Sequence, residues 1–289
     1  MLIENLCRLC GSIRYYSIFA GKHGDYMGKY VRDLTIKESR KAGSDLQLIT
    51  LFTGQPFPGF LPGQFLQIRV DGSSDTFLRR PFSVHDYDSS SGELKILVHI
   101  VGNGSRTLAA MPPGESVNAI FPLGNSFTMP EKGQKVLLVG GGCGIAPLLY
   151  LGRKIVENGI KPQFLLGFRN SSVMPETRPY SELGELLIVT EDGSEGEAGF
   201  VTDHHVLKEG EYDRIYCCGP DEMMKAVVNA PAALNAGCEV SLENLMACGF
   251  GVCLCCIAET VRGNLCTCTD GPVFNSADLK WGQPGISCG

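Results

Sequence analysis

The sequence lacks the features that mark membrane, secreted and nucleic-acid-binding proteins. No run approaches the roughly 20 consecutive apolar residues of a membrane span, and no segment shows the basic, apolar and small-residue zones of a secretory signal. A positive charge excess is also missing, because 25 Lys and Arg face 31 Asp and Glu, for a net charge of -6. The protein therefore has no global attraction to nucleic acid or anionic lipid. We expect a cytoplasmic protein that binds neither.

The composition is that of a turn-rich globular protein. Hydrophobic residues make up 44% of the chain and charged residues 19%, with 36 glycines and 16 prolines, which excludes a disordered chain. A length of 289 residues is long for one compact domain and comfortable for two. Residues 1–26 show no sustained hydrophobic period. We interpret them as a non-native or disordered leader in which Cys7 and Cys10 have no role.

Two patterns divide most of the remaining chain. Residues 27–130 contain short β-rich runs separated by Gly, Pro and Asp, which predict an antiparallel β-barrel interrupted by one helix. Residues 131–237 alternate apolar strands with helical segments, which predicts a parallel sheet covered by helices. Residues 238–289 show little periodicity, so we expect a small subdomain organised by something other than a hydrophobic core. The expected strands are 45–52, 64–70, 81–87, 93–101, 116–121, 135–139, 164–167, 186–190 and 214–217, and the expected helices are 105–111, 145–157 and 221–229.

The cysteines gather near the C-terminus. Seven of the thirteen lie between Cys238 and Cys268, which favours a metal site over disulfides in a chain without a secretion signal. From Cys248 the spacing C-x4-C-x2-C reaches Cys256, and Cys268 follows after eleven further residues. This spacing is typical of plant-type [2Fe–2S] sites. Glycines within the first interval let the backbone wrap around a cluster and donate amides to its sulfurs.

Spacing alone leaves two alternatives open. Structural zinc also uses four cysteines, although its sites usually show paired CxxC knuckles. The fourth cluster ligand is open between Cys266 and Cys268, which are two residues apart. Cys255 is a further spare thiol.

Two segments of the second domain suit a dinucleotide. The strand at 135–139 runs into Gly140-Gly141-Gly142-Cys143-Gly144, and a helix opens at Ala146-Pro147, so free amides and a helix N-terminus can face a pyrophosphate. The Rossmann pattern G-x-G-x-x-G is not met, because Pro147 stands where its last glycine belongs. A plain tight turn is the competing interpretation. The segment Cys218-Gly219-Pro220 adds another strand end and helix start at the same expected sheet edge.

The first domain carries a comparable set. Arg80 can neutralise a pyrophosphate, Ser83 can donate to a flavin ring, and the amides of Gly104 and Ser105 can complete a phosphate site. Taken one at a time, these residues are more often solvated charges and ordinary helix caps. Their value as evidence lies in their occurrence together and in this order.

That order, R-P-x-S, then GGGxGxAP, then CGPxxMM, resembles the ferredoxin–NADP reductase superfamily over residues 30–235. The segments 246–253 (MACGFGVC) and 268–274 (CTDGPVF) narrow the resemblance to the electron-transfer subunit of the two-subunit, NAD-linked dihydroorotate dehydrogenases. The resemblance implies an antiparallel flavin-binding barrel, a parallel-sheet NAD-binding domain and a small C-terminal [2Fe–2S] subdomain. It also selects Cys268 over Cys266 as the fourth ligand, beside Cys248, Cys253 and Cys256.

The resemblance further implies individual cofactor contacts. For FAD these are Arg80, Pro81, Phe82, Ser83, Leu97, Val98, His99, Gly104 and Ser105. For the nicotinamide dinucleotide they are Gly141, Gly142, Gly144, Ala146, Pro147, Asp192, Gly193, Cys218, Gly219, Pro220 and Met223. Three residues depart from the usual family pattern, which leaves individual flavin contacts open: His99, Ser126 and Cys143. Preference for NAD over NADP is open as well, because Arg169 and Arg178 can in principle meet a 2′-phosphate.

By resemblance, a separate FMN-containing catalytic subunit oxidises dihydroorotate to orotate in pyrimidine biosynthesis. Electrons then pass through the cluster and FAD of this chain to NAD+, and we expect a heterotetramer with two copies of each subunit. The nearest alternatives are the related subunits of sulfide dehydrogenase and of NAD-dependent ferredoxin:NADP oxidoreductase. A zinc-stabilised flavoprotein without a redox relay is the alternative from a different class.

Overall fold

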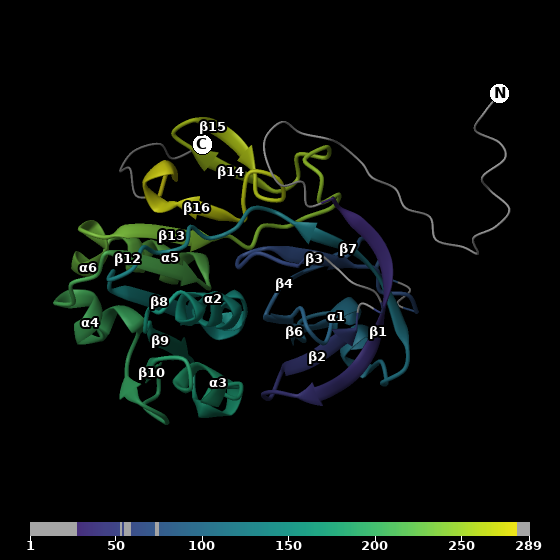
Figure 1. Ribbon diagram of the computed structural model, residues 1–289, viewed down its shortest axis with the longest axis horizontal. Helices are drawn as coiled ribbons and strands as arrows, with labels where there is room; N and C mark the ends of the chain where they lie inside the picture. Colours follow the sequence, from purple (N-terminus) through teal and green to yellow (C-terminus); the bar gives the residue numbers. More distant parts are fainter. Residues whose placement is uncertain (1–27, 53, 55–58, 73–74, 282–289) are drawn as a thin grey trace, which may run out of the picture.

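The computed structural model describes residues 28–52, 54, 59–72 and 75–281 (Figure 1). The expected leader, with Cys7 and Cys10, lies outside the described residues. Among the helices in these ranges, none combines the length and the apolarity that a bilayer crossing requires.

The first half of the chain forms an antiparallel half-barrel, as expected. Its described strands follow the order β4-β3-β7-β1-β2-β6-β5. Alternate side chains face the core: Leu34 and Ile36 of β1 are fully buried, whereas the residues on either side of each are exposed, as a two-residue period requires. The elements of this half are β1 (Tyr30–Lys41), β2 (Leu46–Phe52), β3 (Phe65–Ile68), β4 (Arg80–Ser83), β5 (Asp86–Asp88), β6 (Glu93–His99), α1 (Asn103–Ala110) and β7 (Ser116–Leu123).

The two edge strands of this sheet, β4 and β5, are consecutive in the chain, and the junction between them links the two edges at one corner. Val84 N donates to Gln64 O at 3.0 Å on the β3 side, and His85 N donates to Lys95 O at 2.9 Å on the β6 side. The expected single strand at 81–87 is therefore two short strands, because the chain changes partners between Ser83 and Asp86.

The second half forms a largely parallel sheet in the order β11-β10-β9-β8-β12-β13-β16. Strands β8, β9 and β12 are buried on both faces, which explains their continuous apolar runs. The strands are β8 (Val136–Gly141), β9 (Gln163–Phe168), β10 (Glu185–Thr190), β11 (Glu197–Ala198), β12 (Arg214–Cys218) and β13 (Gly237–Ser241). The helices are η1 (Gly142–Ile145), α2 (Ala146–Glu157), η2 (Ser171–Val173), α3 (Arg178–Ser181), η3 (Val201–Asp203), α4 (His205–Lys208), α5 (Asp221–Val228) and α6 (Pro231–Leu234).

The cysteine-rich segment lies across both halves (Figure 1). It contains the hairpin β14 (Ile257–Thr260) and β15 (Gly263–Cys266), then β16 (Val273–Asn275) and η4 (Ser276–Asp278). Strand β16 pairs antiparallel with β13 and so extends the second sheet. The expected boundary between residues 237 and 238 falls inside β13. Asn125 of the interdomain linker holds the segment, since its Nδ2 donates to Val273 O at 2.8 Å and its Oδ1 accepts from Val273 N at 3.0 Å.

Polar contacts also join the barrel to α2. His85 Nδ1 donates to Ala146 O at 3.0 Å, and Arg153 forms an ion pair with the buried Asp86 at 2.7 Å. Burial lowers the pKa of His85 to about 4, although the hydrogen bond to Ala146 opposes the shift. The imidazole is therefore neutral in the folded protein near pH 7.

This buried histidine predicts a loss of stability in mild acid. Between the ordinary His pKa near 6.5 and about 4, the unfolded chain binds a proton at His85 that the folded chain does not, so stability falls as pH falls through this window. The loss attributable to His85 is about 3 kcal/mol, at 1.36 kcal/mol per pKa unit. Urea unfolding of the wild type and His85→Gln at pH 7 and pH 4.5 measures it.

The variant should show the shallower pH dependence, because it has no imidazole to protonate. His205→Gln, at an exposed position, is the matched control and should behave as the wild type. Equal pH dependence in wild type and His85→Gln would contradict the assignment.

Candidate functional site

The four candidate ligands converge on one loop and one strand end. The backbone from Cys248 to Cys256 turns through positive φ angles at Gly249 (77°), Gly251 (76°) and Leu254 (54°). Glycine adopts such angles at no steric cost, whereas Leu254 holds a strained conformation. The sequence predicted that glycines let the backbone wrap in this loop, and the structure has positive φ angles at both Gly249 and Gly251.

Backbone amides of the loop point at cysteine sulfurs. Phe250 N and Cys253 N donate to Cys248 Sγ at 3.3 and 3.5 Å. Gly251 N donates to Cys268 Sγ at 3.2 Å, and Cys268 N donates to Cys256 Sγ at 3.4 Å. Amide donors of this kind stabilise thiolates and cluster sulfurs. The loop is thus a cradle for negatively charged sulfur.

The sulfurs interact as two pairs. Cys253 lies in contact with Cys248, and Cys256 lies in contact with Cys268. Burial of the Cys248 thiol opposes ionisation, but the backbone hydrogen bonds outweigh it and lower its pKa to about 6. Two thiolate pairs are what a two-iron cluster takes, one pair for each iron.

The spare cysteines lie differently. Cys255 is exposed. Cys266 is buried and ends β15, and its backbone amide donates to Asp270 Oδ2 at 2.8 Å. Asp270 N donates back to Cys266 O at 2.8 Å, so the turn from Cys266 to Asp270 is closed on itself around Cys268.

The cysteine loop packs on the barrel. Cys256, Cys266 and Cys268 belong to one apolar cluster with Met246, and the barrel side of this cluster is formed by β3 and β7 through Phe65, Ile120 and Leu123. The ring of Phe250 is packed against the same cluster and lies beneath Lys29 Nζ at 5.1 Å.

Two fully buried side chains beside this loop carry polar atoms without a hydrogen-bond partner in the described part of the chain: Gln67 and Thr267. An unpaired buried amide or hydroxyl costs about 1–3 kcal/mol. Such groups next to a cysteine cradle fit a site built around an additional polar group, and an iron–sulfur cluster is such a group.

On the barrel, the structure brings Arg80 and Gly104 together. A Cβ placed on Gly104 would meet Arg80 Nε at 3.3 Å and Thr76 Oγ1 at 2.9 Å. Gly104 lies in the first turn of α1, where backbone amides and the helix dipole favour an anion. The guanidinium and the helix start therefore form one cradle of the kind that a pyrophosphate occupies.

The other expected flavin residues lie in several environments. Pro81, Phe82 and Ser83 are half-buried along β4. Leu97 and Val98 are buried in β6, with Val98 in the barrel core. His99 Nε2 lies 3.0 Å from Asp45 Oδ2. Ser105 Oγ accepts from the amides of Val101 and Gly102 at 3.0 and 3.1 Å, so its hydroxyl already caps the helix.

A cavity of about 700 Å³ lies at the carboxyl ends of β8, β9 and β12, with Asp45 and His99 on its barrel side. Six of the expected dinucleotide residues line it: Gly141, Gly142, Gly144, Gly219, Pro220 and Met223. Packing leaves no room for a side chain at two of these glycines, since a Cβ on Gly144 would meet Gly219 Cα at 2.5 Å and one on Gly141 would meet Met223 Sδ at 2.3 Å. This edge of a parallel sheet is where ligands bind.

The remaining expected dinucleotide residues are outside the described lining of this cavity. Cys218 is fully buried, and Ala146 and Pro147 are buried in the first turn of α2. Asp192 and Gly193 lie in an exposed turn, in which Asp192 Oδ1 accepts from Ser194 N at 3.0 Å. The carboxylate of Asp192 therefore stabilises the turn in which it lies.

Charged residues that sequence reasoning did not assign also line the cavity: Asp45, Glu191, Asp221, Glu222 and Glu243. Glu243 is open to the cavity, yet the surrounding protein raises the pKa of its carboxyl by desolvation, against the opposing effect of His99. Asp45, Glu191 and Glu243 come from separate loops, and Asp221 and Glu222 begin α5, so the set shares no local motif. Only Glu191 had a signal, because it directly precedes Asp192 and Gly193, which the resemblance implied as dinucleotide contacts.

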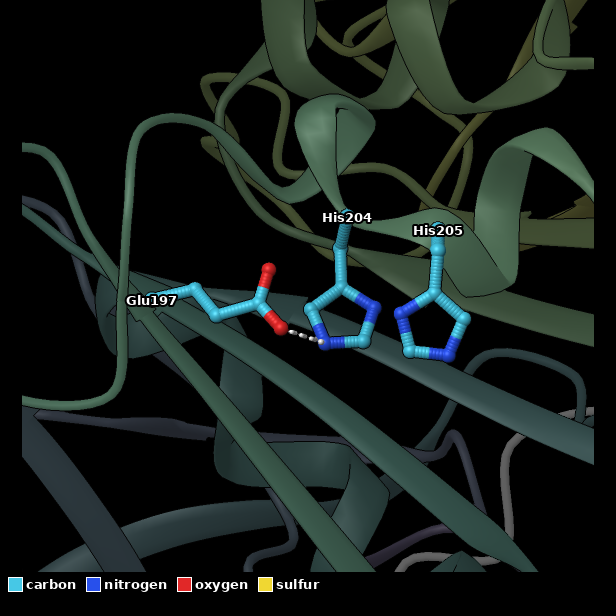
Figure 2. A group of neighbouring side chains, drawn as sticks. All are labelled: Glu197, His204 and His205. Atoms are coloured by element: carbon cyan, nitrogen blue, oxygen red, sulfur yellow. Dashed lines mark ion pairs between the residues drawn. The ribbon is translucent and has the colours of Figure 1, made fainter.

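A second group of potential metal ligands lies in the parallel-sheet domain (Figure 2). Glu197, His204 and His205 each place one ligand atom within 4.8 Å of the others. His204 Nδ1 accepts from Val206 N at 3.3 Å as the cap of α4, which leaves the proton on Nε2, 3.2 Å from Glu197 Oε1. Neither ring nitrogen of His204 keeps a free lone pair for a metal. We interpret this group as a helix cap.

Comparison with known proteins agrees with this geometry. Residues 33–127 match the oxidoreductase FAD-binding domain family, and residues 243–280 match the iron-sulfur cluster binding domain of dihydroorotate dehydrogenase B. The dihydroorotate dehydrogenase B (NAD(+)) electron transfer subunit of Shouchella clausii is 41% identical over 219 residues, which cover 74% of this chain and 84% of that protein. The chain belongs to this family of electron transfer subunits. The Fusobacterium nucleatum subunit is 33% identical over 258 residues, or 86% of this chain and 98% of that one.

Among solved structures, a chain of the NADH-dependent reduced ferredoxin-NADP oxidoreductase is similar, with a TM-score of 0.78 and 28% identity over 86% of this chain and 90% of that one. The expected fold class, the FAD and iron–sulfur cofactors and the role as an electron transfer subunit of NAD-linked dihydroorotate dehydrogenase B in pyrimidine biosynthesis are confirmed. A subunit of this kind works with a catalytic subunit. The individual contact residues stay predictions.

The first of these concerns flavin retention. If Arg80 and the start of α1 hold the FAD pyrophosphate, Arg80→Ala should weaken FAD binding by roughly ten- to a hundredfold, because each charge-assisted hydrogen bond contributes about 1.5–3 kcal/mol. Flavin release on dilution, followed by fluorescence, measures the change. Arg69→Ala, which removes an exposed partner of Asp71, is the control. Full retention of FAD in the Arg80 variant would show that Arg80 does not bind the pyrophosphate.

The second concerns the fourth ligand. Cys268→Ser is expected to lose most of its iron, because three thiolates leave one iron incompletely coordinated. Cys255→Ser and Cys266→Ser should keep it. Iron content and EPR of the dithionite-reduced proteins decide the matter, and a cluster lost in the Cys266 variant but kept in the Cys268 variant would reverse the assignment.

Proposed function

We propose that this chain accepts electrons from an FMN-containing catalytic subunit, in which dihydroorotate is oxidised to orotate, and delivers them to NAD+. Dihydroorotate gives up two electrons and two protons; NAD+ takes both electrons and one proton as a hydride, and the second proton goes to solvent. When bound, the iron–sulfur cluster exchanges single electrons and FAD couples these to hydride transfer.

The observation that carries this proposal is the position of the cysteine loop. One side of the loop packs on β3 and β7, and the other side faces solvent. Three apolar side chains stand on the exposed side, with exposed fractions of 86% for Leu245, 82% for Val252 and 60% for Leu254. We call these three the apolar rim. Exposed apolar side chains around a redox centre suit a protein interface, and the exposed Cys253 lies among them.

Two other apolar residues of this segment, Met246 and Phe250, do not belong to the exposed surface. Met246 is buried, and Phe250 is half-buried against the barrel. Both side chains pack against apolar residues of β3 and β7. These strands are distant in the sequence, so the loop sequence alone does not reveal the contacts. A substitution at Phe250 would therefore disturb the fold together with any interface, and the apolar rim offers cleaner test positions.

The residues of this chain have distinct proposed tasks. The pairs Cys248–Cys253 and Cys256–Cys268 hold one [2Fe–2S] cluster, and Arg80 with the start of α1 holds the FAD pyrophosphate. The glycine loop at 141–144 and the segment 219–223 position the nicotinamide dinucleotide in the cavity. The carboxylates of Glu191, Asp221 and Glu222 line the same cavity as Arg169, and their negative charge disfavours an additional 2′-phosphate. Arg178 is paired with Glu182 at 2.9 Å. NAD is therefore the proposed acceptor.

The likeness to the ferredoxin-NADP oxidoreductase chain favours one second candidate, in which the outside electron partner is a ferredoxin-linked subunit. Both candidates use the same centres in this chain. They differ in the protein that docks on the apolar rim, so reconstitution with defined partners separates them.

Reconstitution provides the decisive prediction. The isolated chain is expected to reduce artificial acceptors with NADH, and to reduce NAD+ with dihydroorotate only after addition of the FMN subunit, in a complex of two copies of each chain. Val252→Asp combined with Leu254→Asp should weaken the complex at least tenfold, since a buried interface charge costs well over 1.4 kcal/mol. Asp tolerates positive φ better than Leu, so the change at Leu254 should not strain the loop.

Leu234→Asp is the matched control, because Leu234 is a 70% exposed side chain on α6. NADH-dependent dye reduction should be equal in all three proteins, and light scattering gives the stoichiometry. Dihydroorotate activity of the chain alone, or normal assembly of the double variant, would contradict the proposal.

A further inference from the structure

Gln67 connects the flavin barrel to the cysteine loop. It lies on β3, where its backbone neighbour across the sheet is Pro81 of β4, the strand proposed to contact FAD. Its side chain leaves the sheet on the opposite side from the barrel core and ends at the loop: a Cβ placed on Gly249 would meet its Oε1 at 2.7 Å and its Nε2 at 3.2 Å. Gly249 directly follows Cys248. The amide therefore stands beside a candidate cluster ligand.

This amide has no hydrogen-bond partner within the residues that the structure describes. Gln67 is 0% exposed, and both its Nε2 and its Oε1 are unpaired and inaccessible. Other glutamines of the same barrel are paired: Gln64 Oε1 accepts from Leu61 N at 2.8 Å, and Gln47 Nε2 donates to Ser39 Oγ at 2.9 Å. A buried amide in an apolar layer costs stability unless a partner is present.

The layer around Gln67 limits what that partner is. Phe65 precedes it by two residues on the same face of β3 and belongs to the apolar cluster that also contains Cys256 and Cys268. The amide is thus enclosed between apolar side chains of the barrel and the backbone of the cysteine loop at Gly249. A glutamine Nε2 donates two hydrogens, and sulfur is the acceptor type that this loop concentrates.

We propose that the Gln67 amide donates a hydrogen bond to a sulfur of the bound cluster on its Cys248 side, and thereby raises the cluster's reduction potential. Reduction adds negative charge to the sulfurs, so a donor stabilises the reduced form more than the oxidised form. Through this bond the barrel that holds FAD sets the affinity of the neighbouring cluster for electrons. The inference rests on the proposed cluster ligation.

The test compares reduction potentials in the purified, cluster-loaded chain. Gln67→Met keeps the length of the side chain and removes the donor, and Gln67→Leu removes the donor with a branched apolar side chain. EPR-monitored redox titration of the wild type should show a cluster that is about tenfold easier to reduce than in either variant, which is 59 mV for a one-electron couple. Gln47→Met, in the same barrel, should match the wild type, and the flavin potential should be equal in all four proteins.

A wild-type chain that binds no iron refutes the proposed function itself, whereas cluster-loaded variants with an unchanged potential refute the role of Gln67 alone. A second measurement covers variants that fail to load. Wild-type protein with ¹⁵N in its glutamine amides should show a weak nitrogen coupling to the reduced cluster in pulsed EPR. Absence of that coupling would overturn the inference regardless of the variants.

Discussion

Four thiolates have to meet in a loop that buries little apolar surface of its own, and the arrangement of the protein follows from this requirement. The loop turns through positive φ angles at Gly249, Gly251 and Leu254 and commits several backbone amides to sulfur. Little is left to hold it in place locally. It is therefore fixed from outside, by apolar contacts to β3 and β7 and by the pairing of β16 with β13.

This external support also sets the order of the sites. The strand under the loop, β3, pairs with β4, on which Arg80 begins the proposed flavin contacts. The sheet extended by β16 carries the dinucleotide cavity at its carboxyl edge, with Asp45 and His99 of the barrel on the opposite wall. Contacts of His85 and Arg153 keep the two halves together. The same contacts that stabilise the loop thus bring it next to the flavin side of the molecule and leave its apolar rim facing outward.

The sequence was a good guide where elements carry a clear hydrophobic period. Strands β2, β6, β8, β9, β10 and β12 and helices α2 and α5 lie within a few residues of the expected ranges. It gave no strand for β1, because only Leu34 and Ile36 are buried in a run rich in charged residues. Strands β13 to β16 were missed as well, since they are short and lie in a cysteine- and glycine-rich segment. Their pairing depends on partners far away in the chain.

The functional sites also fall into those that the sequence predicted and those that only the structure revealed. Cysteine spacing and the glycine loops are local patterns, so the sequence by itself determined the cluster segment, the two dinucleotide elements and the family to which they belong. Only the tertiary structure decided which further groups meet: acidic residues from distant segments around one cavity, and an unpaired Gln67 against Gly249. A sequence motif records residues that must act within one turn or loop. Contacts between distant strands leave no such spacing, because the fold, and not the chain order, brings them together.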